Sequence, residues 1–416
     1  MSDEPSQTSY VGMLALENIR VLDLTHLPPG ALCTMMLADF GADVIKITAP
    51  PAISERGAGA AAMLVENNDE RAVAFDVLNR NKRSIQLNLK SEEARKIFYQ
   101  LVSTADVIVE GFRPGTVKRL KVDYETARTI NSRIVYCSLS GYGQDGPYSS
   151  FSGHDINYIS IAGALGIIGT SEAPSIPLNL LADFAGASLH GVIGILTALI
   201  AREKSGVGQY VDVSYTDGVI NLLSWFFGLH FATGISLARG QSWLHGVYPY
   251  YGVYRTKDDK FISIGCVEPW LWENLCRALG KEGYIPYHIA PEHFFQPPQE
   301  EKWAEISSYL QEVFLTRTRD EWFDFLSSNN IPVGKVYSLD EVAGDSQIVH
   351  RQMIVEIDQP FLGRIRQPGI AIKLSETPGK IRRLAPRPGE HTDEILMSLG
   401  YDAEQIEQLR QRKVVG

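Results

Sequence analysis

The chain has 416 residues, of which 44% are hydrophobic and 21% charged, and this composition excludes a disordered, collagen-like or coiled-coil protein. At about 150 residues per domain, the length predicts two or three domains or one large intertwined unit. The 39 Lys and Arg against 49 Asp and Glu leave a net charge of −10. This balance argues against a nucleic-acid-binding protein, because neutralising phosphates requires a basic surface. A local basic pocket for one anionic ligand remains compatible with it.

The cysteines and the termini of the sequence predict a cytoplasmic setting. The four cysteines have neither CxxC nor His-paired spacing, which predicts no metal site and no disulfide framework. The first ten residues are polar and acidic, unlike a signal peptide. The most apolar stretch, 191–201, is shorter than the ~20 residues that a membrane span needs. We therefore expect a soluble protein with reduced cysteines and no membrane partner.

The first 140 residues alternate between apolar strand patterns and helix patterns. Strands are predicted at 19–24, 44–47, 84–89, 107–109 and 134–138, and helices at 31–40 and 91–103. Ser91 followed by acidic residues is typical of a capped helix start. Strands separated by helices of this length predict right-handed βαβ units and a mostly parallel sheet.

The remaining chain changes character twice. Small residues are dense from 151 to 225, where a long apolar helix is predicted at 183–203 and a strand at 208–213. A second α/β block is predicted from 245 to 345, with a strand at 261–265, helices at 269–279 and 300–315, and a Pro-rich loop at 286–298. The tail ends in an amphipathic segment, 392–412.

Asp183 lies at the predicted start of the long apolar helix and has two interpretations. The first is an N-cap, in which the carboxylate accepts hydrogen bonds from free N–H groups of the first turn. The second is a reaction site, because a helix N-terminus favours an anion or a developing oxyanion. The small residues Gly186, Ala187 and Ser188 would then let a ligand approach the backbone.

Two further acidic or basic positions are candidates for catalysis. His154 is followed by Asp155, a carboxylate that could orient or charge the imidazole, although a lone His is more often structural. Glu268 follows a predicted strand, where loops commonly carry function. Its alternative interpretation is a carboxylate at the start of a helix that opens with Pro269.

Two basic clusters interrupt the acidic chain, one at 80–83 with Lys90 and one at 111–115 with Lys118 and Arg119. Such clusters are usually solvated surface. The second one, however, directly follows the predicted strand 107–109, and ligands of open α/β sheets bind outside the carboxyl ends of strands. No GxGxxG or GxxxxGK[ST] motif follows a strand, so a dinucleotide or P-loop site has no support.

Taken together, these segments resemble the class III coenzyme A transferase superfamily (CaiB/BaiF-like), which includes formyl-CoA transferase, carnitine CoA-transferase and alpha-methylacyl-CoA racemase. The resemblance covers nearly the whole chain and rests on motifs that recur in order. They are GADVIK at 41–46, NKRS at 81–84, GFRPG at 111–115, GYGQ at 141–144, LADFAG at 181–186, GVGQYVD at 206–212, LSETPG at 374–379 and GEHTDE at 389–394.

Within this superfamily the chain is most similar to the racemase branch, through GHDINY at 153–158, the segment 178–186 and VEP at 267–269. The resemblance implies that His154 and Asp183 are the two acid/bases, and that Asp155 and Glu268 support them. It also implies that the backbone N–H of Asp183 holds the thioester oxygen. Other branches use the Asp as a nucleophile and usually have no His at the position of His154.

The resemblance further implies that coenzyme A is bound as part of the substrate, with no other cofactor. Its contacts would be Leu87, Lys90, Gly111, Phe112, Arg113, Arg119 and Leu120. The sequence departs from the racemase pattern in three places: Ala49 replaces a frequent Arg, the insertion between residues 50 and 81 is long, and 244–250 differs. These departures keep a transferase interpretation open.

The family fold implies a Rossmann-like large domain built from both chain ends around a smaller inserted α/β domain, and an interlocked homodimer. The corresponding boundaries are 1–225 for the N-terminal part of the large domain, 226–345 for the linker and small domain, and 346–416 for the returning C-terminal part.

Three functions follow from the sequence. The first is racemisation or epimerisation of a 2-methyl-branched acyl-CoA by proton transfer at the α-carbon. The second is CoA transfer between carboxylic acids through an anhydride and a thioester on Asp183. The third is a CoA-ester-binding protein without activity, against which the presence of His154 and both carboxylates argues.

Overall fold

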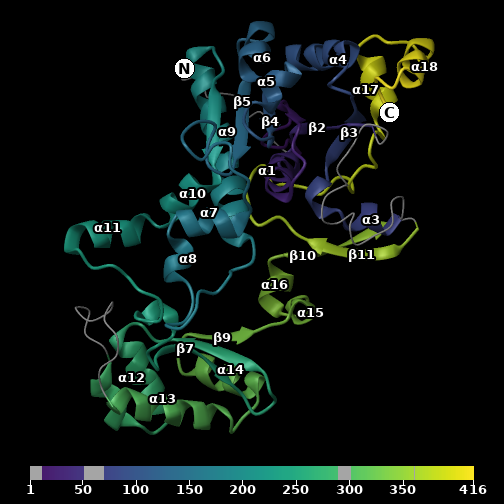
Figure 1. Ribbon diagram of the computed structural model, residues 1–416. Coiled ribbons are helices and arrows are strands. Elements are labelled where there is room, and N and C mark those ends of the chain that lie inside the picture. Colours follow the sequence, from purple (N-terminus) through teal and green to yellow (C-terminus); the bar gives the residue numbers. More distant parts are fainter. Residues whose placement is uncertain (1–11, 51–69, 289–300, 360) are drawn as a thin grey trace, which may run out of the picture. The chain divides into compact units, whose positions relative to one another are not determined.

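A computed structural model describes residues 12–50, 70–288, 301–359 and 361–416 (Figure 1). Most of the insertion expected at 50–81 and most of the loop expected at 286–298 lie outside the described residues. The chain divides into two compact units. The first comprises Met1–Ile159, Leu178–Leu222 and Val349–Gly416, and the second Ser160–Pro177 and Leu223–Ile348. Compared with the expected boundaries, residues 160–177, 223–225 and 346–348 belong to the second unit.

A six-stranded parallel sheet forms the centre of the first unit (Figure 1). Its strands are β1 (Arg20–Asp23), β2 (Asp43–Thr48), β3 (Lys82–Gln86), β4 (Val107–Glu110), β5 (Val135–Ser140) and β6 (Tyr210–Ser214). They are ordered β3-β2-β1-β4-β5-β6, and every neighbouring pair is parallel. The predicted parallel sheet is therefore confirmed. The strand order reverses between β1 and β4, which is where open α/β sheets bind ligands.

Helices connect these strands and cover the sheet. They are α1 (Pro28–Asp39), α3 (Glu70–Phe75), η1 (Val77–Asn79), α4 (Glu92–Ser103), α5 (Thr116–Leu120), α6 (Tyr124–Ile130), α7 (Asp155–Ile161), η2 (Leu180–Leu189), α9 (His190–Ser205) and α10 (Tyr215–Leu222). The predicted cap of α4 is confirmed, because the Ser91 side chain accepts a hydrogen bond from the Ala94 N–H. Apolar residues of α4, including Ile97 and Phe98, are fully buried against the sheet.

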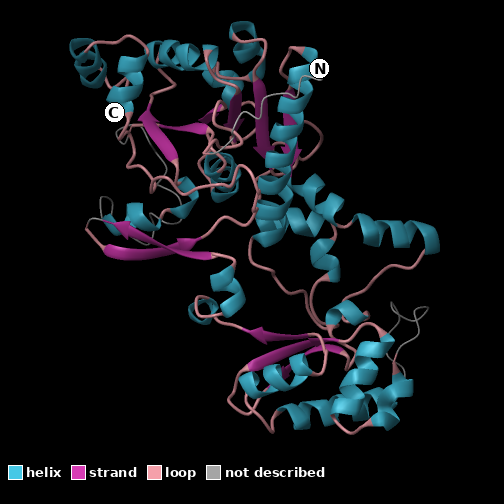
Figure 2. Ribbon diagram, turned by 180° about the vertical axis from the view of Figure 1, so that it is seen from behind, coloured by secondary structure: helices cyan, strands magenta, loops and turns pink. Residues whose placement is uncertain are grey.

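The C-terminal segment returns to the edge of this sheet, so the unit is built from both chain ends. Helix α17 (Thr392–Ser398) packs against β3, and α18 (Ala403–Gln411) follows it. Leu396 and Leu409 are buried in the same hydrophobic cluster as the strand residues. Val415 forms an isolated antiparallel bridge with Leu87. A separate antiparallel hairpin, β10 (Ile354–Gln359) and β11 (Gly363–Pro368), precedes this segment (Figure 2).

The second unit contains a three-stranded antiparallel sheet with helices, which confirms the predicted second α/β block. Its strands β7 (Tyr251–Arg255), β8 (Phe261–Gly265) and β9 (Val333–Val336) are ordered β7-β8-β9. Trp272 and Trp322 are buried in its core. The helices are α8 (Ala164–Ile167), α11 (Ser224–Thr233), η3 (Trp243–His245), α12 (Pro269–Ala278), η4 (Glu282–Tyr287), α13 (Glu301–Phe314), α14 (Arg319–Ser328), α15 (Leu339–Val342) and α16 (Ser346–His350).

The run formed by η2 and α9, Leu180–Ser205, has the length and apolar character of a membrane-crossing helix. It comprises 26 residues, and an 18-residue window within it has a mean hydropathy of 1.8. The prediction that this apolar stretch is too short to span a bilayer is therefore wrong, because helical apolar residues continue on both sides of 191–201. The helix packs against β5 and β6 and buries Ile195 and Ala198. Core helices of soluble proteins meet the same criterion, so the helix alone does not establish a membrane span.

A buried ionic cluster joins the first three strands of the sheet to α1. Asp23, at the end of β1, is fully buried and accepts hydrogen bonds from Lys82 Nζ at 3.1 Å, Lys46 Nζ at 3.3 Å and the Thr34 hydroxyl at 2.7 Å. Burial alone would raise the pKa of Asp23, but the two ammonium groups and the threonine hydroxyls hold this pKa well below its usual range. Burial in turn lowers the pKa of Lys82 to about 8, although Asp23 opposes this.

Replacing Asp23 should strongly destabilise the protein. Asp23→Ala leaves the buried Lys82 and the largely buried Lys46 without their counter-charge, which typically costs about 3–5 kcal/mol of unfolding free energy. Denaturant-induced unfolding measures this change. Glu92→Ala, which breaks an exposed ion pair with Lys96, is the matched control and should leave the unfolding free energy unchanged. An Asp23→Ala effect no larger than that of the control would contradict the structural role.

Candidate active site

His154 is held in place by a loop built around a tyrosine ring. A Cβ atom at Gly141 or Gly153 would lie 2.2 Å or 2.6 Å from the Tyr158 ring, so only glycine leaves room for this ring. The Tyr158 hydroxyl donates to the Gly153 carbonyl at 2.6 Å. The His154 N–H donates to the Asn157 side chain at 3.0 Å. These contacts fix the backbone at the start of α7, while the His154 side chain is exposed.

The next residue, Asp155, is buried and joins α7 to η2. Its Oδ2 atom accepts the backbone N–H groups of Ala182 and Asp183, both at 2.8 Å. Both N–H groups belong to the first turn of η2 and have no partner within that helix. Asp155 thus caps a helix that begins 25 residues further along the chain, at Leu180. Its other oxygen, Oδ1, is buried and has no hydrogen-bond partner in the described structure.

Asp183 is the fourth residue of η2, a π-helical segment that continues into the α-helix α9. The N-cap interpretation of Asp183 is therefore wrong: the N-cap position is Asn179, and the capping carboxylate is Asp155. Asp183 instead accepts a hydrogen bond from the Asn179 side chain at 3.3 Å. π-helical turns are rare and frequently occur at functional sites.

Two expectations about the start of this helix are corrected. The Asp183 N–H, expected to hold a thioester oxygen, already donates to Asp155 in this structure. The small residues 186–188 are buried in contacts within the fold and do not face a ligand. A Cβ at Gly186 would lie 2.9 Å from the Tyr215 carbonyl oxygen of α10, and the Ser188 hydroxyl donates to the Pro29 carbonyl at 2.7 Å.

The electrostatics couple His154, Asp155 and Asp183. Burial raises the pKa of Asp183 and the Asp155 carboxylate raises it further, while the Asn179 hydrogen bond and His154 oppose the change. Burial, Tyr142 and Asp183 raise the pKa of Tyr158 to about 12, and the Arg113 guanidinium opposes this. The two carboxylates, the imidazole and an arginine from the loop after β4 therefore share one electrostatic environment.

Glu268 lies in the second unit. It occupies the N-cap position of α12 immediately before Pro269 and makes no side-chain capping hydrogen bond. This position agrees with the alternative interpretation of Glu268 as a carboxylate at the start of a helix. Its support of His154 stays a prediction.

The loop at 111–115 emerges from β4 at the point where the strand order reverses. Phe112 in this loop packs edge-on against the ring of His26, with the ring centroids 5.0 Å apart. His26 follows β1, so the residues after both central strands meet here. Although part of His26 is exposed, desolvation by the surrounding atoms and the Lys46 ammonium lower the pKa of its imidazole to about 4. Sequence reasoning missed His26, although its position directly after a predicted strand was the available signal.

The residues expected to bind coenzyme A fall into two groups at the carboxyl edge of the sheet. Gly111, Phe112 and Arg113 lie in the loop after β4, with Arg119 and Leu120 on the adjoining helix α5. Leu87 and Lys90 follow β3, which is separated from β4 by β2 and β1. The side chains of Arg113, Arg119 and Lys90 are exposed. The Leu87 side chain is buried in the core, so this residue could only offer its backbone.

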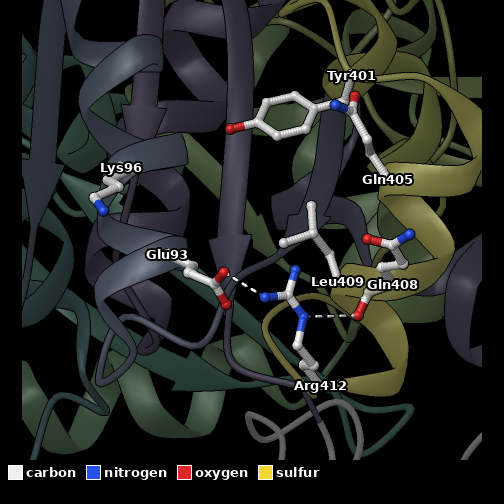
Figure 3. A pocket seen from close by; sticks show the side chains of 7 residues that line it. All are labelled: Glu93, Lys96, Tyr401, Gln405, Gln408, Leu409 and Arg412. Atoms are coloured by element: carbon white, nitrogen blue, oxygen red, sulfur yellow. Dashed lines mark hydrogen bonds and ion pairs between the residues drawn. The ribbon is translucent and has the colours of Figure 1, made fainter.

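A groove elsewhere on the first unit contains none of these residues. It lies between α4 and α18, has a volume of about 290 Å³, and is crossed by an ion pair between Glu93 and Arg412 (Figure 3). Its lining residues are Glu93, Lys96, Tyr401, Gln405, Gln408, Leu409 and Arg412. The predicted site is therefore distinct from this groove.

Comparison with known proteins supports the resemblance. The sequence model of CoA-transferase family III matches residues 16–392. The chain is 33% identical to human alpha-methylacyl-CoA racemase over 97% of its length and 98% of the relative's. It is 32% identical to formyl-CoA:oxalate CoA-transferase of Rhodopseudomonas palustris (strain TIE-1), over 93% of this chain and 94% of the relative. A CaiB/BaiF family protein from Brucella suis has a similar structure, with a TM-score of 0.76 and 25% identity over 93% of this chain and all of the other. The chain belongs to CoA-transferase family III.

Proposed function

We propose that the protein is a racemase or epimerase of 2-methyl-branched acyl-CoA thioesters. The observation that carries this proposal is the hydrogen bond from the Asp183 N–H to Asp155, the residue next to His154, which brings the segments of both candidate acid/bases together at the junction of α7 and η2. Inverting a carbon centre by proton transfer requires one group to remove the proton and a second group to return it to the other face. A transferase of this family requires only the carboxylate. The proposal therefore gives His154 a function that CoA transfer would not.

In the proposed reaction, Asp183 or His154 removes the proton from the α-carbon of the thioester. The electrons of the C–H bond form an enolate on the thioester oxygen, and the other residue donates a proton to the opposite face. Burial and Asp155 raise the pKa of Asp183, which makes its carboxylate a stronger base. Asp155 also holds the η2 backbone against α7 and so positions Asp183.

We place coenzyme A at the carboxyl edge of the sheet, along the loop 111–115 and α5. Three features support this placement: the reversal of strand order between β1 and β4, the exposed Arg113 and Arg119, and the coupling of Arg113 to Tyr158 beside Asp183. The thioester is the substrate, and the reaction as written needs no other cofactor.

CoA transfer is the second candidate. It is supported by the 32% identity to a formyl-CoA:oxalate CoA-transferase and by the Asp183 carboxylate, which can act as a nucleophile. An oxygen of Asp183 would attack the thioester carbonyl and form a mixed anhydride as the CoA thiolate leaves. The thiolate would then attack the Asp183 carbonyl of this anhydride, which releases the donor acid and leaves a CoA thioester on Asp183. An acceptor carboxylate would displace the thiolate from this thioester to form a second anhydride, and attack of the thiolate on the acceptor carbonyl would give the new acyl-CoA and free Asp183.

Exchange in heavy water distinguishes the two candidates. If the protein is a racemase, a 2-methylacyl-CoA incubated with it in heavy water without an acceptor acid gains deuterium at the α-carbon and loses its stereochemical purity. His154→Ala and Asp183→Asn should each slow this reaction by about 10²–10⁴-fold, because each removes an acid/base. His350→Ala, at an exposed histidine of α16, is the matched control and should leave the rate unchanged. NMR and chiral analysis of the product measure both changes.

The opposite result identifies the transferase. No α-exchange, together with CoA transfer that depends on an acceptor acid and a hydroxylamine-trappable adduct on Asp183, would refute the racemase proposal. Binding without either reaction would support a CoA-ester-binding protein without activity.

The pH dependence of the exchange tests the role of Asp155. Because Asp155 raises the pKa of Asp183, Asp155→Asn should lower this pKa and move the acidic limb of the rate profile to lower pH. The limb should be absent in Asp183→Asn. An acidic limb that stays in place or moves to higher pH in Asp155→Asn would contradict the proposed coupling.

We also propose that the protein is a cytoplasmic homodimer. Helix α11 buries none of its residues, although several of them are large and apolar. Trp225 and Phe231, for example, are 56% and 78% exposed. A second copy of the chain would cover such an apolar surface. Sedimentation at low concentration should give twice the mass of the 46.2 kDa chain. A stable species with the mass of one chain would contradict the dimer.

A further inference from the structure

Glu110 is a buried carboxyl group that none of the steps above uses. It is the last residue of β4 and directly precedes the loop 111–115, and its residue exposure is only 1%. Its Oε2 atom accepts the Phe112 N–H at 2.7 Å. Its Oε1 atom is buried without a hydrogen-bond partner in the described structure. The carboxyl group thus holds the loop at the residue whose ring packs against His26.

The ionisable groups that face Glu110 from β5, β6 and α10 are acidic or neutral. They are Tyr136 and Cys137 on β5, Tyr210 and Asp212 on β6, and Tyr215 on α10. On its other side, β1 ends in Asp23 with its two lysines and continues to His26. The Tyr210 hydroxyl donates to Ser138 Oγ at 2.9 Å, which leaves the Ser138 proton available to other acceptors.

These surroundings place the ionisation of Glu110 near neutral pH. Burial raises the pKa of Glu110 to about 7, and the Asp212 carboxylate contributes to the increase. The Ser138 hydroxyl and the Phe112 N–H oppose it. Both charge states are therefore populated under physiological conditions, and they differ as acceptors, because an ionised acceptor makes a hydrogen bond about twice as strong as a neutral one.

We propose that Glu110 is a positioning residue that fixes the loop 111–113 through the Phe112 N–H and thereby sets the affinity for the coenzyme A part of the thioester. This inference rests on the proposed function, because it takes this loop as the coenzyme A site. Glu110 acts on binding and not on proton transfer, since its contact is with the loop backbone and not with His154 or Asp183.

The proposal predicts a pH-dependent KM with a defined sign. As the pH falls through about 7, Glu110 takes up a proton, its hydrogen bond to Phe112 weakens, and the loop is held less firmly. KM for the acyl-CoA should therefore rise roughly three- to tenfold from about pH 8 to about pH 6, while kcat follows only the ionisation of the acid/bases.

Steady-state kinetics of the full-length protein test this prediction. Glu110→Gln keeps a side-chain oxygen of the same reach but cannot ionise, so its KM should be raised and lack the limb near pH 7, with kcat within about twofold of the wild type. Asp212→Asn removes a neighbouring carboxylate that raises the pKa of Glu110, so this variant should keep the limb but move it to lower pH. A pH-independent wild-type KM, or the same limb in Glu110→Gln, would overturn the proposal.

Amide hydrogen exchange of the free protein provides a readout without substrate. The protection factor of peptides containing Phe112 should fall from about pH 8 to about pH 6 in the wild type and stay constant in Glu110→Gln. If that variant does not fold, the wild-type profile still decides, because constant protection contradicts the proposal. Wild-type protein that turns over the thioester with a pH-independent KM refutes only this inference. Wild-type protein that binds no CoA ester refutes the proposed function and, with it, this inference.

Discussion

The carboxylate of Asp23 is the interaction on which the architecture of the first unit depends. An isolated ammonium group cannot remain charged in a protein interior, and here Lys82 is fully buried and Lys46 largely so. Asp23 is the shared counter-ion of both, and each lysine comes from a different strand of the sheet. This geometry requires the ends of β1, β2 and β3 to lie side by side in one register. The edge at which His26 and the loop 111–115 emerge is therefore set by charge as well as by apolar packing.

The candidate active site also contains a buried carboxylate, but in the described structure this carboxylate has no lysine beside it as a hydrogen-bond partner. Asp155 is also buried, but its partners are two backbone N–H groups and not cations, so it adds negative charge beside Asp183. Burial and this added negative charge raise the pKa of Asp183, so Asp183 holds a proton more readily than an ordinary surface carboxylate does. Glu110 extends the pattern to the loop 111–115. Asp155 and Glu110, which accept backbone N–H groups, thus differ from Asp23, which accepts hydrogen bonds from two lysines.

The elements that the sequence predicted well are those that depend on local pattern. Apolar runs, and apolar–polar alternation at 84–89, correctly predicted five strands in the first 140 residues, and Ser91 with its acidic neighbours marked a real helix start. Similarly, the motif around His154 and Asp155 and the position of Asp183 led to residues that are coupled in the structure.

The features that could not be predicted arise from contacts between distant residues. The π-helical form of η2 leaves no clear signature in the order of apolar side chains. The bond from Asp183 N–H to Asp155 joins residues 28 positions apart, and it removed the donor expected for a thioester oxygen. Gly186 lies where η2 packs against α10. A Cβ at Gly218 of α10 would lie 2.2 Å from the Gly186 carbonyl oxygen. No local pattern distinguishes this use of glycine from an opening for a ligand.

The return of the C-terminal segment to β3 has a consequence for biosynthesis. Leu396 and Val415 are part of the core of the first unit, yet they are translated after the second unit. The sheet edge formed by β3 therefore cannot receive this segment until the second unit has been translated. The second unit has its own core between residues 248 and 331 and can close before translation ends. Folding in the cell would then begin with the inserted unit and finish with the one that carries the candidate acid/base residues.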